Sequence, residues 1–278
     1  SSPLLTLISS LIVLINCFYF PRLLFLFISI TKLCLDLDFS GQKLPYRKKQ
    51  DDCNFLLLPC HPDGRDESLI YGDIAPNKNR NAVPCTATGC TWPKTGSYVY
   101  IPVDISPVYS VAERNIIING LVSFYTSTCI RFVWKNSRVG TQCSSYLGRQ
   151  GGLQIVTLQR NGCVYHSMVQ HSVNHALGFH HEHVRSDRDS YVRVLTQNII
   201  PGQEQNFVKI PTNNLGTPYD FNSIMHYNKY AFSINGQPTL LSRANPSLNF
   251  GTATSMSAND ITRINRLYRC CEKNIKLF

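Results

Sequence analysis

The sequence predicts an α+β fold with a short mixed sheet, two long helices and an irregular C-terminal half. Residues 98–105 are rich in tyrosine, valine and isoleucine, which is typical of a strand. Residues 110–124 and 164–177 place apolar side chains at helical spacing. The chain after Gly178 is rich in Pro, Asn and Gly, which indicates an irregular region before a last helix that begins near Ser257.

The first eighty residues differ in composition from the rest. Residues 4–30 are strongly apolar, with Pro21 and Arg22 as their main interruption. A secretory signal has a shorter apolar core after a basic start, whereas a membrane signal-anchor needs about 17–25 apolar residues. The stretch fits a signal-anchor and equally fits a signal peptide fused to mistranslated sequence, which we favour. The chain divides into a signal-like or anchor-like segment, a linker with a short propeptide, a folded domain and a tail, at residues 1–35, 36–80, 81–271 and 272–278.

Two helix starts are marked by capping boxes, in which a serine and an acidic residue three positions later bind each other's backbone amides. Ser110 and Glu113 open one helix, and we expect its apolar stripe to be Ile116, Ile117, Leu121 and Phe124. Ser257 and Asp260 open the last helix, and we expect its inward side chains to be Ile261, Ile264, Leu267 and Tyr268. A further strand is predicted at residues 153–158.

Three histidines have the spacing of a metal site. His171 and His175 are four residues apart in the predicted helix, so their rings share one face and can hold one ion. Such a pair alone is more often an ordinary core or surface feature. Gly178 can end the helix in the left-handed conformation, however, and the reversed chain then brings in His181. Three imidazoles around an open fourth position form a catalytic type of zinc site, so we expect one zinc ion.

The residues around these histidines resemble the astacin branch of the metzincin peptidases. The pattern H-x-x-x-H-x-x-G-x-x-H continues as His-Glu-His-Val-Arg-Ser-Asp-Arg-Asp over residues 181–189, which fits the extended astacin motif at every fixed position. Residues 223–227, Ser-Ile-Met-His-Tyr, match the Met-turn of the family. The flanks 81–85 and 260–268 resemble hatching-enzyme-like astacins, and the resemblance covers roughly residues 66–271.

The resemblance implies a two-lobed metzincin fold with the cleft between the lobes. It also implies a zinc metalloendopeptidase that acts on protein or peptide substrates as a monomer. Met225 would lie beneath the metal, and Tyr227 would approach the zinc and help to stabilise the transition state. The formal net charge of +10 is accompanied by no nucleic-acid motif, so we expect no nucleic-acid partner.

Ser172 stands where the family has the glutamate that takes a proton from the zinc-bound water. A serine hydroxyl is too weak a base and too short to replace it, and loss of a general acid–base costs about 10²–10⁴ in rate. Three interpretations stay open: an impaired peptidase, a zinc-containing pseudoprotease that binds peptides, and a degenerate gene product. A nucleophilic role for Ser172 is not favoured, because no oxyanion motif or acidic partner accompanies it.

A second departure from the family follows the strand at 129–133. Only residues 134–142 precede Cys143, where the family has a strand that lines the cleft and pairs with the substrate backbone. We expect this strand to be lost or much shortened. Its neighbour would then gain an unpaired edge, and an extended substrate would lose its template.

Residues 70–73, Ile-Tyr-Gly-Asp, resemble the family's propeptide motif, in which an aspartate ligates zinc in place of water. Gly-Asp alone is more often an ordinary turn. This one lies just upstream of Arg80 and Asn81, where a mature astacin chain would begin. We therefore expect Asp73 to be the inhibitory ligand and an activating protease to cut after Arg80. The resemblance places the freed Asn81 amino group near Glu182.

The chain has eleven cysteines. The resemblance implies three disulfides, Cys85–Cys90, Cys143–Cys163 and Cys129 with either Cys270 or Cys271. Disulfides require an oxidising compartment, so we expect a secreted, extracellular protein. The odd total means that at least one thiol stays unpaired or bonds to another chain.

Overall fold

The structure is a computed structural model that describes residues 69–75, 90–134, 145–152, 154–160 and 163–270, and the backbone of 56–58. These residues belong to one compact unit, Asp51–Phe278. Within them, no helix is both long and apolar enough to cross a membrane. The expected signal-anchor at residues 4–30 lies outside the described residues.

The N-terminal lobe comprises the described residues up to 178 and those after 257. A five-stranded mixed sheet forms its centre. Its longest strand, β3 (Tyr98–Ile105), has the bounds that the sequence predicts. Parallel to β3 run β4 (Ile130–Trp134) and, on the other side, β1 (Leu56–Leu58), which also pairs in parallel with β5 (Ile155–Thr157). The short β2 (Lys94–Thr95) pairs with the start of β3 in the antiparallel sense.

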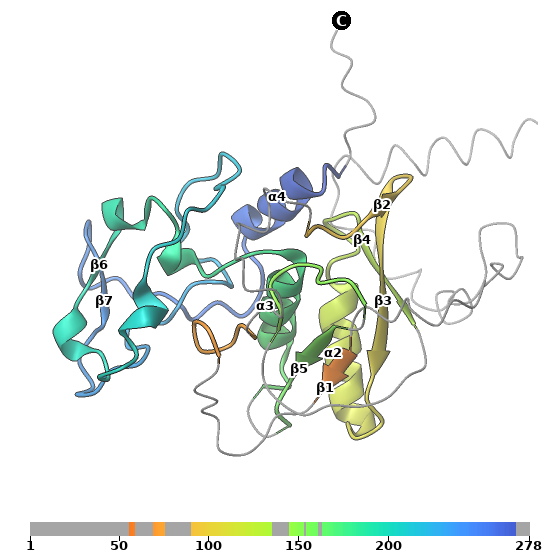
Figure 1. The fold of residues 1–278 in the computed structure, drawn as a ribbon, viewed down its shortest axis with the longest axis horizontal. Helices are drawn as coiled ribbons and strands as arrows, with labels where there is room; N and C mark the ends of the chain where they lie inside the picture. The colour runs from red at the N-terminus through yellow and green to blue at the C-terminus, as the bar shows by residue number, and fades with distance from the viewer. Residues whose placement is uncertain are drawn as a thin grey trace, which may run out of the picture. The chain divides into compact units, whose positions relative to one another are not determined.

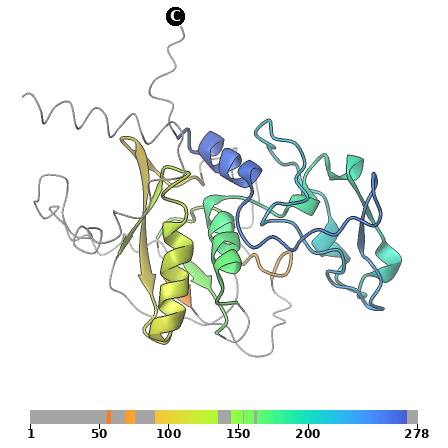
Figure 2. The ribbon, with the colours of Figure 1, turned by 180° about the vertical axis from the view of Figure 1, so that it is seen from behind.

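Two helices, α2 (Val111–Val122) and α3 (His166–Leu177), lie side by side against this sheet in both views (Figures 1 and 2). They approach closely at Gly120, where an added Cβ would lie only 2.5 Å from a methyl carbon of Val169. The capping box of Ser110 and Glu113 is formed. One member of the predicted stripe is wrong, because Ile116 is 37% exposed while its neighbour Ile117 is fully buried.

The last helix, α4 (Ala258–Leu267), closes the N-terminal lobe. Its capping box between Ser257 and Asp260 is formed. Ile264 and Tyr268 are buried in the same apolar cluster as α2 and α3, and the Tyr268 hydroxyl donates to the carbonyl of Leu177 at 2.8 Å. Just past the helix, Cys270 forms a disulfide with Cys129, which decides between the two partners left open by the sequence.

The C-terminal lobe, residues 179–257, has its own apolar cluster, which contains Val192, Ile199, Phe207, Tyr219, Leu240 and Phe250. Its regular structure is limited to two paired strands and four short 3₁₀ helices: β6 (Val192–Val194), β7 (Leu240–Ser242), Glu182–Val184, Arg188–Ser190, Thr196–Asn198 and Glu204–Phe207. In both views β6 and β7 lie far from β3. The α+β class and the irregular second lobe are therefore as predicted.

The predicted unpaired edge beside the missing strand is wrong. The facing edges of β3 and β5 are both paired, because β1 lies between them. The shortened segment itself, residues 135–144, lies outside the described residues. The strand that occupies the gap comes from a part of the chain that precedes the predicted domain.

Candidate metal centre

The three candidate histidines converge on one point. His171 and His175 project from the same face of α3, and Gly178 ends that helix in the left-handed conformation with φ of 106°. The reversed chain brings His181 back beside them. The Nε2 atom of His171 lies 3.0 Å from that of His175 and 3.3 Å from that of His181.

Backbone carbonyls fix which nitrogen of two of these rings carries the proton. Nδ1 of His171 lies 2.8 Å from the carbonyl oxygen of Ile224, and Nδ1 of His175 lies 2.7 Å from that of Phe179. A carbonyl only accepts, so each neutral ring is protonated at Nδ1 and presents a bare Nε2 lone pair. Two lone pairs that face each other at 3.0 Å repel unless a cation lies between them.

Asp73 completes the group. Its Oδ2 lies 2.8 Å from Nε2 of His171, 3.2 Å from that of His181 and 3.4 Å from that of His175. The four ligand atoms lie within 4.8 Å of one another and form a set that could hold a metal ion. Three imidazoles and one carboxylate are ordinary zinc ligands, so the residues fit the expected ion.

The segment that carries Asp73 is fixed to the edge of the sheet. The amide of Ser145 donates to the carbonyl of Asp73 at 3.0 Å, and the amide of Ala75 donates to the carbonyl of Ser145 at 2.9 Å. Ser145 also forms an antiparallel bridge with Val156 of β5. This edge therefore binds residues 73–75 through two main-chain hydrogen bonds at the single bridge between Ile74 and Ser145, so at least one pairing position remains despite the shortened loop.

Tyr227 contacts the segment that carries Asp73. Its hydroxyl donates to the carbonyl of Tyr71, and its ring stacks on His183 with centroids 3.8 Å apart. Burial and then the nearby Asp73 carboxylate raise the pKa of Tyr227 well above its ordinary value. The phenol therefore stays protonated at neutral pH and remains a hydrogen-bond donor, about 4.6 Å from His181 between ring centroids.

The turn that contains Met225 is tied to α4. Asp260 accepts from the hydroxyl of Ser223 at 2.6 Å and from the amide of Ile224 at 2.9 Å. Because the Ile224 carbonyl in turn orients His171, Asp260 positions a candidate ligand from a distant helix. The sequence marks Asp260 as a capping residue, and nothing in its pattern reveals this second contact.

Glu182 is buried between two arginines. Arg263 donates to it at 2.6 and 2.9 Å and Arg185 at 3.1 Å, while the amide of Asp220 donates at 2.7 Å. Asn81, its expected partner, lies outside the described residues, as does Arg80. The guanidinium groups of Arg263 and Arg185 thus offset the negative charge of Glu182. The sequence motif did not predict these two partners.

The remaining candidates are placed as follows. Ser172 is 8% exposed on α3, between His171 and Val173. Cys90 is disulfide-bonded, and its expected partner Cys85 lies outside the described residues. Cys143 and Cys271 also lie outside them, so the Cys143–Cys163 pair stays a prediction.

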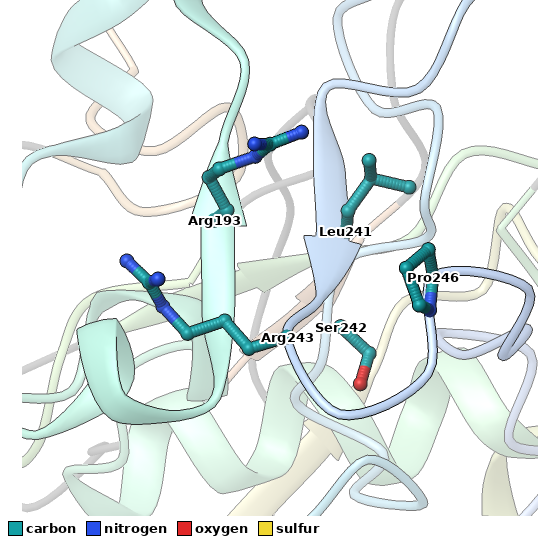
Figure 3. A pocket seen from close by; sticks show the side chains of 5 residues that line it. All are labelled: Arg193, Leu241, Ser242, Arg243 and Pro246. Carbon is teal, nitrogen blue, oxygen red and sulfur yellow. The ribbon is translucent and has the colours of Figure 1, made fainter.

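A separate surface pocket of about 180 Å³ lies on the C-terminal lobe and is lined by Arg193, Leu241, Ser242, Arg243 and Pro246 (Figure 3). It is formed on β6 and β7 and contains none of the four candidate ligands. The chemistry suggested by the histidines therefore does not involve this pocket.

The zinc assignment leads to a direct prediction. We expect the purified chain to retain one zinc ion after dialysis and His175→Ala to lose most of it, because the remaining ligands leave an incomplete shell. His166→Ala is the matched control, since His166 lies on the same helix outside the ligand group. Atomic spectrometry gives the metal content. Equal loss in both variants, or a folded wild-type chain without zinc, would contradict the assignment.

Comparison with known proteins agrees with the geometry. Residues 87–269 match the family model described as Astacin, a peptidase family. The chain is 46% identical over 214 residues to High choriolytic enzyme 1 of Oryzias latipes, which covers 74% of this chain and 79% of that protein. It is 42% identical over 216 residues to Low choriolytic enzyme of the same fish, with 73% and 79% covered. The solved structure of High choriolytic enzyme 1, a hatching enzyme zinc-protease, superimposes with a TM-score of 0.64 over 68% of this chain and 100% of that one, at 47% identity.

Proposed function

Because the chain belongs to the astacin family of zinc metallopeptidases, we propose that it is a secreted, latent member whose metal site is intact and whose peptidase activity is impaired by Ser172. The observation that carries the proposal is the convergence of His171, His175 and His181 with Asp73. The Cys129–Cys270 disulfide supports secretion.

The proposed roles of the ligand residues and of Tyr227 in catalysis are the following. His171, His175 and His181 would hold the zinc, with Asp73 in the fourth position. When bound, zinc polarises a peptide carbonyl and lowers the pKa of a coordinated water. Tyr227, a protonated donor next to His181, would supply a hydrogen bond to the oxyanion once the carbonyl of Tyr71 leaves it.

Ser172 removes the base from this arrangement. The family's glutamate both accepts a proton from water and returns it to the leaving amine, and a hydroxyl does neither at neutral pH. We therefore expect a rate about 10²–10⁴ lower than that of an equivalent chain with glutamate.

A second candidate function is the binding of extended peptides without cleavage. It is favoured by Ser145, which already pairs through its backbone with residues 73–75. A peptide partner in the same place would form the same hydrogen bonds, and none of these needs a general base. Activity against casein and binding of a non-cleaved extended peptide separate the two functions.

Latency is assigned to Asp73. Its carboxylate, 2.8 Å from Nε2 of His171, would exclude a substrate carbonyl or water from the metal, and the hydrogen bond from Tyr227 to Tyr71 would belong to the same closed state. An activating protease that cuts after Arg80 would start the release of this segment. The active form would be a monomer that acts on protein or peptide substrates.

We expect Asp73→Ala, in the full chain, to open the zinc to a small hydroxamate probe at least about tenfold more readily than the wild type, because the fourth ligand is gone. The same variant should still cleave casein poorly, since Ser172 remains. Fluorescence titration measures probe binding, and Asp187→Ala, which alters an acidic side chain outside the ligand group, is the control. Unchanged access in Asp73→Ala would refute the latency, and efficient casein cleavage would refute the impairment.

A further inference from the structure

The position between β3 and β5 in the sheet is occupied by β1, a strand that precedes both of them in the chain. Leu56 and Leu57 lie opposite Asp104 and Ile105 of β3, and Leu56–Leu58 lies opposite Ile155–Thr157 of β5, parallel in both cases. We infer that residues 56–58 are an integral strand of the folded domain, and that the chain upstream of Arg80 stays bound to the rest after a cut there. The leader strand would then remain a non-covalently held part of the cleaved monomer, even where the segment around Asp73 is released from the metal.

The local chain is too short to fill this position. Residues 135–144, which number ten (144 − 134), join the end of β4 to Ser145. β4 lies on the opposite side of β3 from β1, and a crossover to a parallel neighbour needs about a dozen residues or more. A segment of ten residues therefore cannot cross β3, form a parallel strand and still reach Ser145.

Leaving the position between β3 and β5 empty would destabilise the fold. The walls of this position are buried, with Ile105 at 4%, Val156 at 0% and Thr157 at 3% exposure. Without β1, the backbone groups of these two strands that face each other would lose their partners inside the lobe. The sequence of β1 is Leu-Leu-Leu, and continuous apolar runs of this kind are typical of parallel strands inside a sheet.

β1 also affects the proposed inhibition by Asp73, because the two belong to the same upstream part of the chain. Asp73 follows β1 in the chain, and its own carbonyl accepts from the amide of Ser145, so the segment is anchored both at β1 and at Asp73. A cut after Arg80 would loosen Asp73 but leave it tethered to an embedded strand, so it would still compete with substrate for the metal at a high local concentration. This step rests on the proposed latency, whereas the strand itself does not.

The experiment uses the full chain with residues 77–80 replaced by the recognition sequence of a highly specific protease. After cutting, we expect the two pieces to elute together in size-exclusion chromatography under native conditions and to separate in denaturant. Asp73→Ala removes the metal contact and should not release the leader. Leu57→Pro removes a strand amide and should release it, while Arg65→Pro, outside β1, serves as the matched proline control.

Hydrogen exchange on the uncut wild type gives a second measurement in case Leu57→Pro does not fold. Amides of 56–58 should exchange at least about 100-fold more slowly than those of a free peptide, as expected for a core strand. Exchange at the free-peptide rate would overturn the inference. So would separation of the cut wild-type pieces with an unchanged melting transition, or release by Asp73→Ala alone. Joint elution of a chain that binds no zinc would refute the proposed function and leave this inference standing.

Discussion

Ser172→Glu should raise the rate of peptide cleavage about 10²–10⁴-fold, provided that the metal is accessible. The comparison is best made in the full chain that also carries Asp73→Ala, so that the fourth ligand does not mask the effect. The added carboxylate would follow His171 on α3 and could accept a proton from a water on the metal. Initial rates of casein hydrolysis, normalised to zinc content, measure the gain.

The decisive control for this gain is Ser172→Gln in the same background. Glutamine has the size of glutamate and cannot act as a base at neutral pH, so it should leave the rate near that of the serine chain. A gain in both variants would mean that side-chain volume, and not proton transfer, limits the reaction. An unmutated chain that already matches the glutamate variant would contradict the assigned impairment.

Much of the N-terminal lobe follows from local patterns. β3 has its predicted bounds because its side chains alternate between buried and exposed over eight residues. Both capping boxes form because their partners are three residues apart and need no distant contact. The convergence of the three candidate histidine ligands was also predictable, since His171 and His175 share a helical face and Gly178 permits the reversal to His181.

The contacts that the sequence does not predict join residues far apart in the chain. The exposure of Ile116 depends on where α2 meets α3, and helical spacing does not specify that rotation. β1 pairs with β3 and β5 in the place of the strand predicted to be missing between β4 and Ser145. A short apolar run in a sequence does not indicate which strands it will pair with. The link from Asp260 to the turn at 223–224 spans the two lobes, and only the fold brings these groups together.

Glu182→Gln should be among the most destabilising substitutions that conserve volume. Glu182 is 2% exposed and accepts hydrogen bonds from Arg263 and Arg185. Removing one partner of a buried ion pair leaves an uncompensated charge and costs about 3–5 kcal/mol. For a domain of this size that corresponds to a melting temperature lower by roughly 6–20 °C.

The matched control is Glu113→Gln, which removes the charge from a surface pair with Arg160, whose side chain is 46% exposed. Glutamine can keep the capping box, and an exposed ion pair contributes at most about 1 kcal/mol. Denaturation should be followed both with and without zinc, because Glu182 adjoins His181. If Glu182→Gln matched the control in the zinc-free protein, its effect would come from the metal site. A large loss in both states would show instead that the buried carboxylate holds Arg185 of the 181–189 motif and Arg263 of α4 together independently of the metal.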